Sequence, residues 1–230
     1  MKNLLLLQPL QFYERWPMPA DFTALVSSTP TLAFPQLAGA LSDYNVVYLD
    51  GIARDVSLDE FTKHIHWADA ILVNAHSSIG ALNVEANVKF IRSVNTDKII
   101  IIGGHHATLY DLEWLGRGVD FVVRQEGERT IVELVQAIAR RGPYDGILGL
   151  SWRDGSKGFC RNPPRPLVPD MDDLPIPDWS ILDPTAYHLP LALKGYAASV
   201  ETSRGCSYKC NFCAASRMWN CQQRFKSAER

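Results

Sequence analysis

Three cysteines lie close together near the C-terminal end of the sequence. Within RGCSYKCNFC, residues 204–213, Cys206, Cys210 and Cys213 have the spacing C-x3-C-x2-C. Thiolates this close on one short loop can converge on one face of a metal centre and leave one coordination position open. The clustering favours a metal over disulfide bonds, since three cysteines cannot all pair among themselves. Chemistry at an open metal position is therefore the first hypothesis.

A fourth thiol keeps a second hypothesis open. Cys221 follows Cys213 by eight residues, and a structural zinc site requires a closed set of four ligands. A four-cysteine zinc module is thus the alternative to a redox centre. Cys160 stands apart from these four cysteines.

Other residues suited to ligand binding follow short apolar runs in the N-terminal part of the chain. Gly103 and Gly104 end the run KIIIIG, and without a Cβ they let a flat ring or a phosphate approach the backbone. An ordinary strand-to-helix turn is the alternative. The stretch SSIG offers hydroxyls and backbone donors at Ser77, Ser78 and Gly80, although helix capping by Ser78 explains it equally well.

Two further loops belong to this group. The stretch EGE follows another apolar run and places Glu126 and Gly127 at the same expected edge, while Glu128 also suits the positive N-terminus of the next helix. His105 and His106 follow the glycine pair and could contact a ligand there. The alternative is a pair of exposed loop histidines.

Five apolar runs rich in β-branched residues must position these loops. The strands are expected at residues 3–8, 45–50, 69–75, 98–103 and 119–124. Segments of helical pattern separate them, at 35–43, 58–67, 80–94, 109–116 and 128–141. Nearly continuous apolar strands joined by crossover helices are typical of a parallel sheet covered on both faces. The sequence therefore predicts an α/β fold, a doubly wound five-stranded parallel sheet that binds ligands at the carboxyl ends of its strands.

The pattern changes in the rest of the chain. Residues 146–161 hold two short apolar stretches around RDGSKG, which predicts a β-hairpin. Residues 162–190 contain eight prolines and five aspartates, a composition typical of an extended, semi-rigid linker. A fresh strand at 195–203 is then expected to lead into the cysteine loop. The expected divisions are a domain at 1–142, a hairpin extension at 143–162, a linker at 163–194 and an incomplete second domain at 195–230.

Composition excludes several classes of protein. With 47% apolar and 21% charged residues the chain can bury a normal core, as a soluble globular protein does. A net charge of −2 gives no field that attracts nucleic acid or an anionic membrane, although residues 201–230 carry six Lys or Arg against two Glu. Gln8 and Pro9 interrupt the leucine run before it reaches signal-peptide length, and no stretch is long enough to span a bilayer. We expect a cytoplasmic protein with no nucleic-acid partner and no membrane span.

The motifs together resemble those of cobalamin-dependent radical S-adenosylmethionine (SAM) enzymes. CSYKCNFC is similar to their cluster loop, including the aromatic Phe212 before the last cysteine, and the flanking ETSRGC and AASRMW also resemble this branch. IIIIGGHHAT, VDFVVRQEGERTIVELV and MDDLPIPDW resemble the cobalamin-binding half and linker, including those of relatives of anaerobic magnesium-protoporphyrin monomethyl ester cyclase. Their order along the chain is the family order. The sequence departs from the family's GEGE at Gln125.

The resemblance implies three cofactors on a flavodoxin-like cobalamin-binding fold. Cys206, Cys210 and Cys213 would ligate a 4Fe-4S cluster that also binds SAM, with Phe212 beside the adenine. Cobalamin would contact Ser77, Ser78, Gly80, Gly103, Gly104, His105, Glu126 and Gly127. The implied reaction cleaves SAM to a 5′-deoxyadenosyl radical, for methyl transfer or oxidative cyclisation of a small-molecule substrate. An electron donor such as flavodoxin or ferredoxin would reduce the cluster.

Two features of the sequence shape these expectations. Many cobalamin proteins ligate cobalt with the histidine of D-x-H-x-x-G after the first strand, but QPLQFYERW has no histidine, and the nearest imitation is His76 in NAHSSIG. We therefore expect cobalt to have no protein histidine beneath it.

The sequence also contains only the expected first strand and cluster loop of a radical SAM barrel.

The short barrel region leads to expectations about the chain by itself. We expect a truncated start of the barrel and an isolated chain that is inactive. The sequence leaves open whether the chain is a truncated piece, a fragment, or one half of a split gene whose barrel is separately encoded. Two alternatives remain open: a cobalamin carrier or sensor without redox chemistry, and a zinc-binding structural module.

Overall fold

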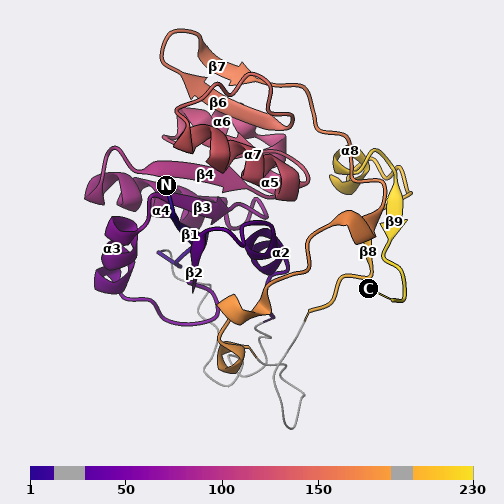
Figure 1. The fold of residues 1–230 in the computed structure, drawn as a ribbon, viewed down its shortest axis with the longest axis horizontal. Helices are drawn as coiled ribbons and strands as arrows, with labels where there is room; N and C mark the ends of the chain where they lie inside the picture. The colour runs from indigo at the N-terminus through magenta and orange to yellow at the C-terminus, as the bar shows by residue number, and fades with distance from the viewer. Residues whose placement is uncertain (13–28, 188–198, 230) are drawn as a thin grey trace.

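Parallel strands form the centre of the molecule (Figure 1). The computed structural model describes residues 1–12, 29–187 and 199–229. The parallel strands in these residues are β1 (Asn3–Gln8), β2 (Asn45–Asp50), β3 (Ala70–Asn74), β4 (Ile99–Gly103) and β5 (Phe121–Val123). They are arranged in the order β2-β1-β3-β4-β5, which is the flavodoxin-like order. The five predicted strands and the doubly wound α/β fold are confirmed.

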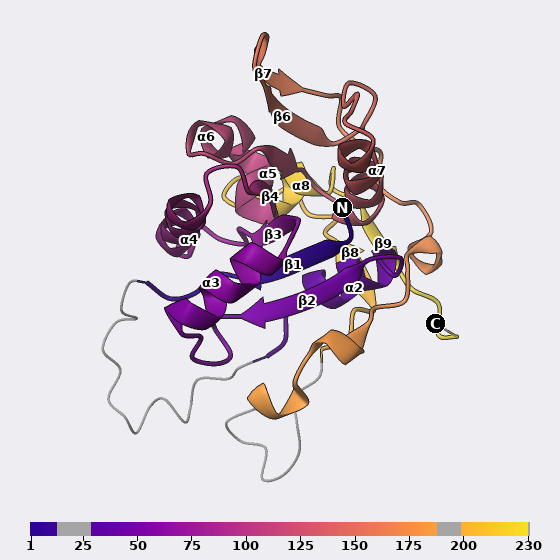
Figure 2. The same cartoon turned by 60° about the vertical axis from the view of Figure 1, so that its left-hand side comes forward.

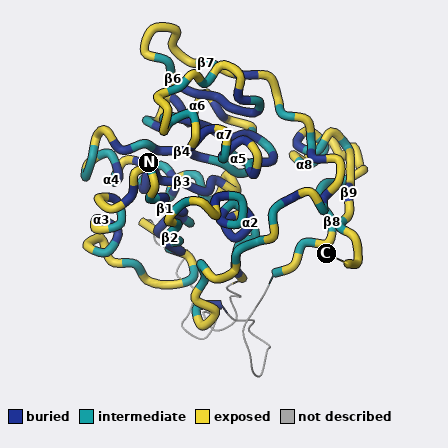
Figure 3. Tube along the Cα trace, in the orientation of Figure 1, coloured by how far each residue is buried: buried dark blue, intermediate teal, exposed yellow. Residues whose placement is uncertain are grey.

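Helices cover both faces of this sheet (Figure 2). The helices between strands are α2 (Ala33–Ala40), α3 (Leu58–Trp67), α4 (Ala81–Val94), α5 (His105–Leu109), α6 (Asp111–Gly116) and α7 (Gly127–Ala139). Phe61 of α3 and Val88 of α4 belong to the hydrophobic core on one face, and Phe34 of α2 and Leu134 of α7 to the core on the other. These cores account for the buried strands in Figure 3.

The helix predicted at 109–116 is confirmed as α6, and a short helix that the sequence did not predict, α5, precedes it. Tyr110 separates α5 from α6 with φ −125° and ψ 39°, which are not helical values. The first of the two helices begins directly after Gly104, whose φ is +103°. The helix predicted at 58–67 is observed as α3, and the Ser57 side chain caps it by accepting a hydrogen bond from the Glu60 backbone N–H. No helix within the described ranges has the length and apolar character needed to cross a membrane.

The predicted hairpin extends the same sheet. β6 (Leu150–Asp154) and β7 (Gly158–Arg161) pair antiparallel, and β6 also pairs antiparallel with β5. The sheet of the described chain therefore has seven strands, where the sequence predicted five strands and a separate extension. The reason is that β5 would otherwise leave an unpaired edge, which β6 covers by pairing Ser151 with Val122. The predicted domain boundary at residue 142 stays a prediction.

The Pro/Asp-rich segment packs against the sheet domain. Its regular structure consists of 3-10 helices at Met171–Asp173, Trp179–Ile181 and Pro184–Ala186, each preceded by an aspartate whose side chain accepts a backbone hydrogen bond. The Asp178 backbone N–H donates to Pro35 O at 2.8 Å. The Tyr187 hydroxyl donates to Asp50 Oδ2 at 2.8 Å and ties the segment to β2. Residues 188–194 of the predicted linker lie outside the described residues.

The C-terminal segment, residues 199–229, forms a small unit of its own. It consists of β8 (Ser203–Gly205), α8 (Ala215–Met218) and β9 (Gln223–Phe225), with β8 and β9 antiparallel. The strand predicted at 195–203 is wrong for the described residues 199–202, which form no strand, and 195–198 lie outside the described residues. Strand structure begins at Ser203 because β9 supplies hydrogen-bond partners only from there to Gly205.

Candidate functional site

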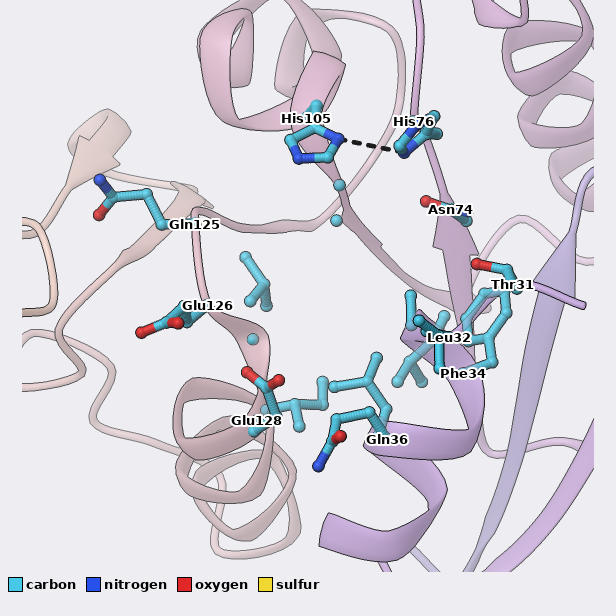
Figure 4. Close-up of a pocket in the computed structure, with 18 of the residues that line it drawn as sticks. Thr31, Leu32, Phe34, Gln36, Asn74, His76, His105, Gln125, Glu126 and Glu128 are labelled. Carbon is cyan, nitrogen blue, oxygen red and sulfur yellow. Dashed lines mark hydrogen bonds between the residues drawn. The ribbon is translucent and has the colours of Figure 1, made fainter. Parts of the chain in front are cut away.

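A cavity of about 380 Å³ lies at the carboxyl ends of β3, β4 and β5. Residues from α2, the strand ends and the start of α7 form its walls, as Figure 4 shows. The C-terminal segment contributes Glu201, Arg204, Met218 and Trp219 to the lining. The Gln125 side-chain amide donates to Met218 O at 3.0 Å and joins the two parts. The cavity therefore lies at the edge where the fold predicts a ligand, with the cysteine-bearing segment beside it.

The glycine pair forms part of this cavity. Gly103 and Gly104 both line it. A Cβ on Gly104 would lie 2.8 Å from Ala75 O and 2.8 Å from Asn74 Oδ1. Together with its φ of +103°, this contact restricts the position to glycine. The close approach thus brings the β4–α5 turn against the end of β3, which shapes the mouth of the cavity.

His105 and His106 are both half-buried. The alternative of two exposed loop histidines is therefore wrong. His105 Nδ1 lies 3.1 Å from His76 Nδ1 at the cavity mouth (Figure 4). Burial, and then the neighbouring His76, lower the pKa of His105. The Trp114 indole N–H donates to His106 Nδ1 at 3.1 Å, so His106 has a structural partner. His105 is therefore the histidine of the pair that lines the cavity.

Glu126 and Glu128 contact the C-terminal segment through arginines. Glu126 Oε1 accepts hydrogen bonds from Arg224 Nη2 at 2.8 Å and Arg204 Nη1 at 3.1 Å. Glu128 Oε1 lies 2.9 Å from Arg204 Nη1, and Arg204 Nε donates to Glu201 Oε1 at 2.9 Å. We call these five residues the arginine clasp.

The clasp is buried, which strengthens its electrostatics. Burial acts to raise the pKa of Glu126, but the Arg224 hydrogen bond, the Val168 backbone N–H and the arginine charges outweigh it and lower the pKa. Burial likewise acts to lower the pKa of Arg204, but Glu128 and Glu201 outweigh it and raise the pKa. Glu126 and Arg204 are therefore charged near neutral pH, and the clasp holds the C-terminal segment on the sheet domain.

Sequence reasoning identified Glu126 but missed Arg204 and Arg224. The available signal was the excess of Lys and Arg in residues 201–230, which this clasp partly neutralises. The acidic partners lie 78 and 98 positions away in sequence, so no local pattern connects them. Glu126 and Gly127 do line the cavity, as expected for residues at this edge.

The SSIG residues lie in the β3–α4 loop and do not line the cavity. Ser77 and Ser78 are exposed, and the Ser77 hydroxyl accepts a hydrogen bond from the Gly80 backbone N–H at 3.4 Å. Gly80 precedes α4 without a side-chain cap from Ser78. A role for these three residues in cofactor binding stays a prediction.

The cysteine loop is largely exposed. Cys206 is half-buried, Cys210 and Cys213 are exposed, and all are free thiols. Phe212 is 93% exposed. Within residues 1–12, 29–187 and 199–229, no three metal-ligating side chains are grouped so as to hold a metal ion. The chemistry of the donor set, three thiols on one loop, still fits an iron-sulfur cluster, for which these thiols must converge.

Cys221 does not complete a zinc site in this arrangement. Its thiol donates to Ser216 O at 3.7 Å. The backbone N–H of Cys206 instead donates to Gln222 O at 3.1 Å, beside Cys221 in the chain. The position of the Cys221 thiol therefore does not support a four-cysteine zinc site.

Comparison with known proteins identifies relatives of the whole chain. The B12 binding domain family matches residues 21–135. An uncharacterized methyltransferase of Pyrococcus horikoshii is 33% identical over 237 residues, which cover 100% of this chain and 49% of that protein. The anaerobic magnesium-protoporphyrin IX monomethyl ester cyclase of Rubrivivax gelatinosus is 26% identical over 193 residues, covering 79% of this chain and 33% of the cyclase. The chain thus spans about half or less of the length of these curated relatives.

Solved structures share the fold. The radical SAM methyltransferase TsrM from Kitasatospora setae, with cobalamin and a 4Fe-4S cluster bound, matches 94% of this chain and 42% of its own at a TM-score of 0.60 and 19% identity. The cobalamin-dependent SAM radical enzyme OxsB, with aqua-cobalamin bound, matches 92% of this chain and 28% of its own at a TM-score of 0.65 and 19% identity. The family resemblance read from the motifs is confirmed. The chain belongs to the B12-binding domain family, among the relatives of cobalamin-dependent radical SAM enzymes.

Proposed function

We propose that this chain binds cobalamin in the cavity at the carboxyl ends of β3, β4 and β5. The observation that carries the proposal is the position of this cavity, lined both by the B12-binding fold and by the segment that bears the cysteine loop. Apolar walls from Phe34, Leu72 and Ile101 would exclude water from the ligand. Asn74 and His105 at the mouth would orient its polar rim (Figure 4).

The polar groups that line the cavity suit a large ring with polar side chains. Asn74, His105, Gln125 and Glu128 are polar residues of its lining. Cobalamin carries amide side chains that could exchange hydrogen bonds with groups of this kind. When bound, it supplies a cobalt centre that can carry a methyl group.

The cysteine loop would extend this function to radical chemistry. Cys206, Cys210 and Cys213 would hold a 4Fe-4S cluster, which supplies the electron for SAM cleavage, and Phe212 would lie beside the adenine of SAM. Arg204, two residues before Cys206, would position the loop relative to the cavity through the clasp. Named relatives include methyltransferases, so methyl transfer to a small molecule is the reaction class we favour, with cyclisation second.

The remaining expectations belong to this same proposal. A reduced flavodoxin or ferredoxin would supply the electrons. Thiolates that hold a cluster need a reducing compartment, which is the basis for proposing a cytoplasmic location.

A cobalamin carrier without redox chemistry is the second candidate. The observation that favours it is the arrangement of the thiols in the described part of the chain, where they are not grouped around a common point. In this case the cavity would bind cobalamin and the cysteines would hold no cluster.

Anaerobic reconstitution distinguishes these candidates. The purified chain is incubated with hydroxocobalamin, iron and sulfide, desalted, and analysed for corrinoid, iron, sulfide and zinc. We expect bound corrinoid with iron and sulfide in equal amounts, and loss of iron and sulfide but not corrinoid in the triple variant Cys206→Ala, Cys210→Ala, Cys213→Ala. Corrinoid without iron would support the carrier, and zinc without corrinoid would contradict both candidates.

A further inference from the structure

A second pocket, of about 240 Å³, shares two wall residues, Gln125 and Met218, with the cavity described above. It is formed by α5, the chain after β5, the end of β7 and α8, and Figure 2 shows α8 beside α5. Of the described residues that line it, three are arginines and none is acidic. The lining consists of Thr108, Leu109, Arg124, Gln125, Arg161, Pro164, Arg217 and Met218.

A single carboxylate compensates the charge of these arginines. Asp111 Oδ2 lies 2.8 Å from Arg161 Nε and 3.6 Å from Arg124 Nε. Among the described residues no other acidic side chain forms an ion pair with the three arginines, so two positive charges remain in excess. Burial and the charge of Arg161 outweigh Asp111 and lower the pKa of Arg124, as expected where positive charge is incompletely compensated.

Two of the arginines have N–H groups available to a ligand. Arg161 donates a side-chain hydrogen bond only through Nε within the described chain, and its side chain is 54% exposed. Arg217 is exposed, and its side chain contacts no hydrogen-bond acceptor among the described residues. Arg124, in contrast, is buried and donates to Leu150 O and Asn162 O. It therefore contributes charge to the pocket, while Arg161 and Arg217 offer the contacts.

The excess charge and the shape of the donors indicate the chemical class of the ligand. A guanidinium group presents paired, coplanar N–H donors that match the oxygens of a phosphate. A phosphate monoester carries close to two negative charges near neutral pH, which equals the excess positive charge of the pocket, whereas a carboxylate carries only one. Leu109 and Pro164 supply apolar surface for the organic part of such a molecule.

We propose that the second pocket binds the phosphate group of a small phosphate monoester, held between Arg161 of the sheet domain and Arg217 of the C-terminal segment. Arg217 lies in α8, four residues after Cys213. The bound phosphate would therefore link the cysteine-bearing segment to the sheet at a place separate from the arginine clasp. This site does not depend on cobalamin binding, because its contacts come from side chains of the second pocket alone.

Inorganic phosphate is the simplest probe of this site. Its binding to the unmodified chain is measured by isothermal titration calorimetry near neutral pH, with chloride keeping the ionic strength constant. Acetate is titrated in the same way as a singly charged carboxylate. We expect saturable binding of one phosphate per chain, about tenfold or more stronger than the binding of acetate, because the dianion can form an additional charge-assisted contact.

The variant Arg217→Gln sharpens the test, since this side chain has no ion-pair partner to lose within the described residues. Phosphate should bind to it about tenfold or more weakly. Arg161→Gln should show a similar loss, with circular dichroism confirming that it folds. Arg129→Gln is the matched control, because Arg129 lies on α7 outside the pocket with its side chain 51% exposed. It should bind phosphate as the unmodified chain does.

Corrinoids distinguish a free phosphate monoester from the phosphodiester in the nucleotide tail of cobalamin. The phosphate titration is repeated with saturating hydroxocobalamin and with saturating cobinamide, which lacks that phosphodiester. Phosphate binding that is unchanged by both corrinoids supports the proposed site. Loss of phosphate binding with hydroxocobalamin but not with cobinamide would assign the arginines to the cofactor and overturn the proposal.

The remaining outcomes separate this site from the proposed function. No saturable phosphate binding to the unmodified chain, or an equal loss in Arg217→Gln and Arg129→Gln, would also overturn the site and would leave cobalamin binding untouched. If neither corrinoid binds, the proposed cobalamin function fails. The phosphate site then stands on the titrations performed without corrinoid.

Discussion

Gly104 is the residue at which backbone conformation and the cavity depend on each other most directly. Its φ of +103°, and the 2.8 Å that would separate an added Cβ from Ala75 O, leave no room for a side chain. We expect Gly104→Ala to lower the free energy of unfolding by about 2 kcal/mol, from backbone strain together with the displaced turn. Urea denaturation monitored by circular dichroism measures this loss.

A second glycine provides the control for that substitution. Gly116 ends α6, and a Cβ there would meet nothing within 4 Å. Gly116→Ala should change the stability by no more than about 1 kcal/mol. Equal losses in the two variants would contradict the role given to Gly104.

His105 makes stability depend on pH. Its pKa is lowered by burial and by His76, so the folded state favours the neutral ring. The unfolded chain binds the proton more readily, and stability is therefore lost as the pH falls below the ordinary histidine value of about 6.5 toward the folded pKa. We expect a smaller free energy of unfolding at about pH 5.5 than at about pH 7.5.

Histidine variants check the source of this dependence. His105→Asn should reduce the difference between the two pH values, and the remainder should include His106, whose pKa burial also lowers. His66→Asn serves as the control, because His66 is exposed on α3. An unchanged pH dependence in His105→Asn would show that another group is responsible.

The residues of the site were predictable only where they depend on local sequence. Gly103, Gly104, Glu126 and Gly127 follow apolar runs, and strand ends in a parallel sheet meet at one edge, so their common position could be expected. One buried oxygen of Glu128 has no hydrogen-bond partner among the described residues, which could not be predicted from the sequence. It depends on which N–H groups of Arg204 reach Glu128 in the folded chain.

At the scale of elements, the arginine clasp determines how firmly the C-terminal segment is docked. Arg204→Ala would leave Glu126, Glu128 and Glu201 with fewer positive neighbours in a buried setting, a change of the kind that costs about 3–5 kcal/mol when one partner of a buried pair is removed. We expect faster amide exchange throughout β8 and β9. Hydrogen exchange measured by mass spectrometry reports this directly.

An exposed ion pair supplies the comparison for the clasp. Lys157 and Asp145 are 3.7 Å apart, with side chains 63% and 68% exposed. Lys157→Ala should leave exchange in β8 and β9 unchanged, because solvated pairs contribute little. If Arg204→Ala also left it unchanged, the clasp would not be what holds the segment.

Helices and strands could be predicted from the sequence where a short stretch of residues was enough to define them. The parallel strands were recognised from continuous apolar runs, since burial on both faces requires them. Helix α5 was missed because its five residues, His105–Leu109, are too few to show a helical pattern. The strand expected at 195–203 was misplaced because β8 exists only where β9, about twenty residues later in the chain, provides its partner.

At the scale of the whole molecule, the cavity couples two parts of the chain. Its lining includes Ile101 and Gly103 from the sheet and Arg204 and Trp219 from the C-terminal segment. A ligand that binds only the folded protein at a concentration of about 100 Kd adds about 2.7 kcal/mol of stability. We therefore expect cobalamin to slow amide exchange in both parts together. Protection confined to the sheet would contradict a cavity shared with the segment.

The anchoring of Tyr187 to Asp50 has a consequence for this coupling. The hydroxyl contact fixes the chain on β2 only sixteen positions before β8 begins at Ser203. An anchor at this distance along the chain keeps the C-terminal segment near the cavity at an effective concentration on the order of millimolar. Any opening of the C-terminal segment away from the cavity would thus be an intramolecular event. Loss of the arginine clasp would therefore loosen the C-terminal segment without releasing it from the sheet domain.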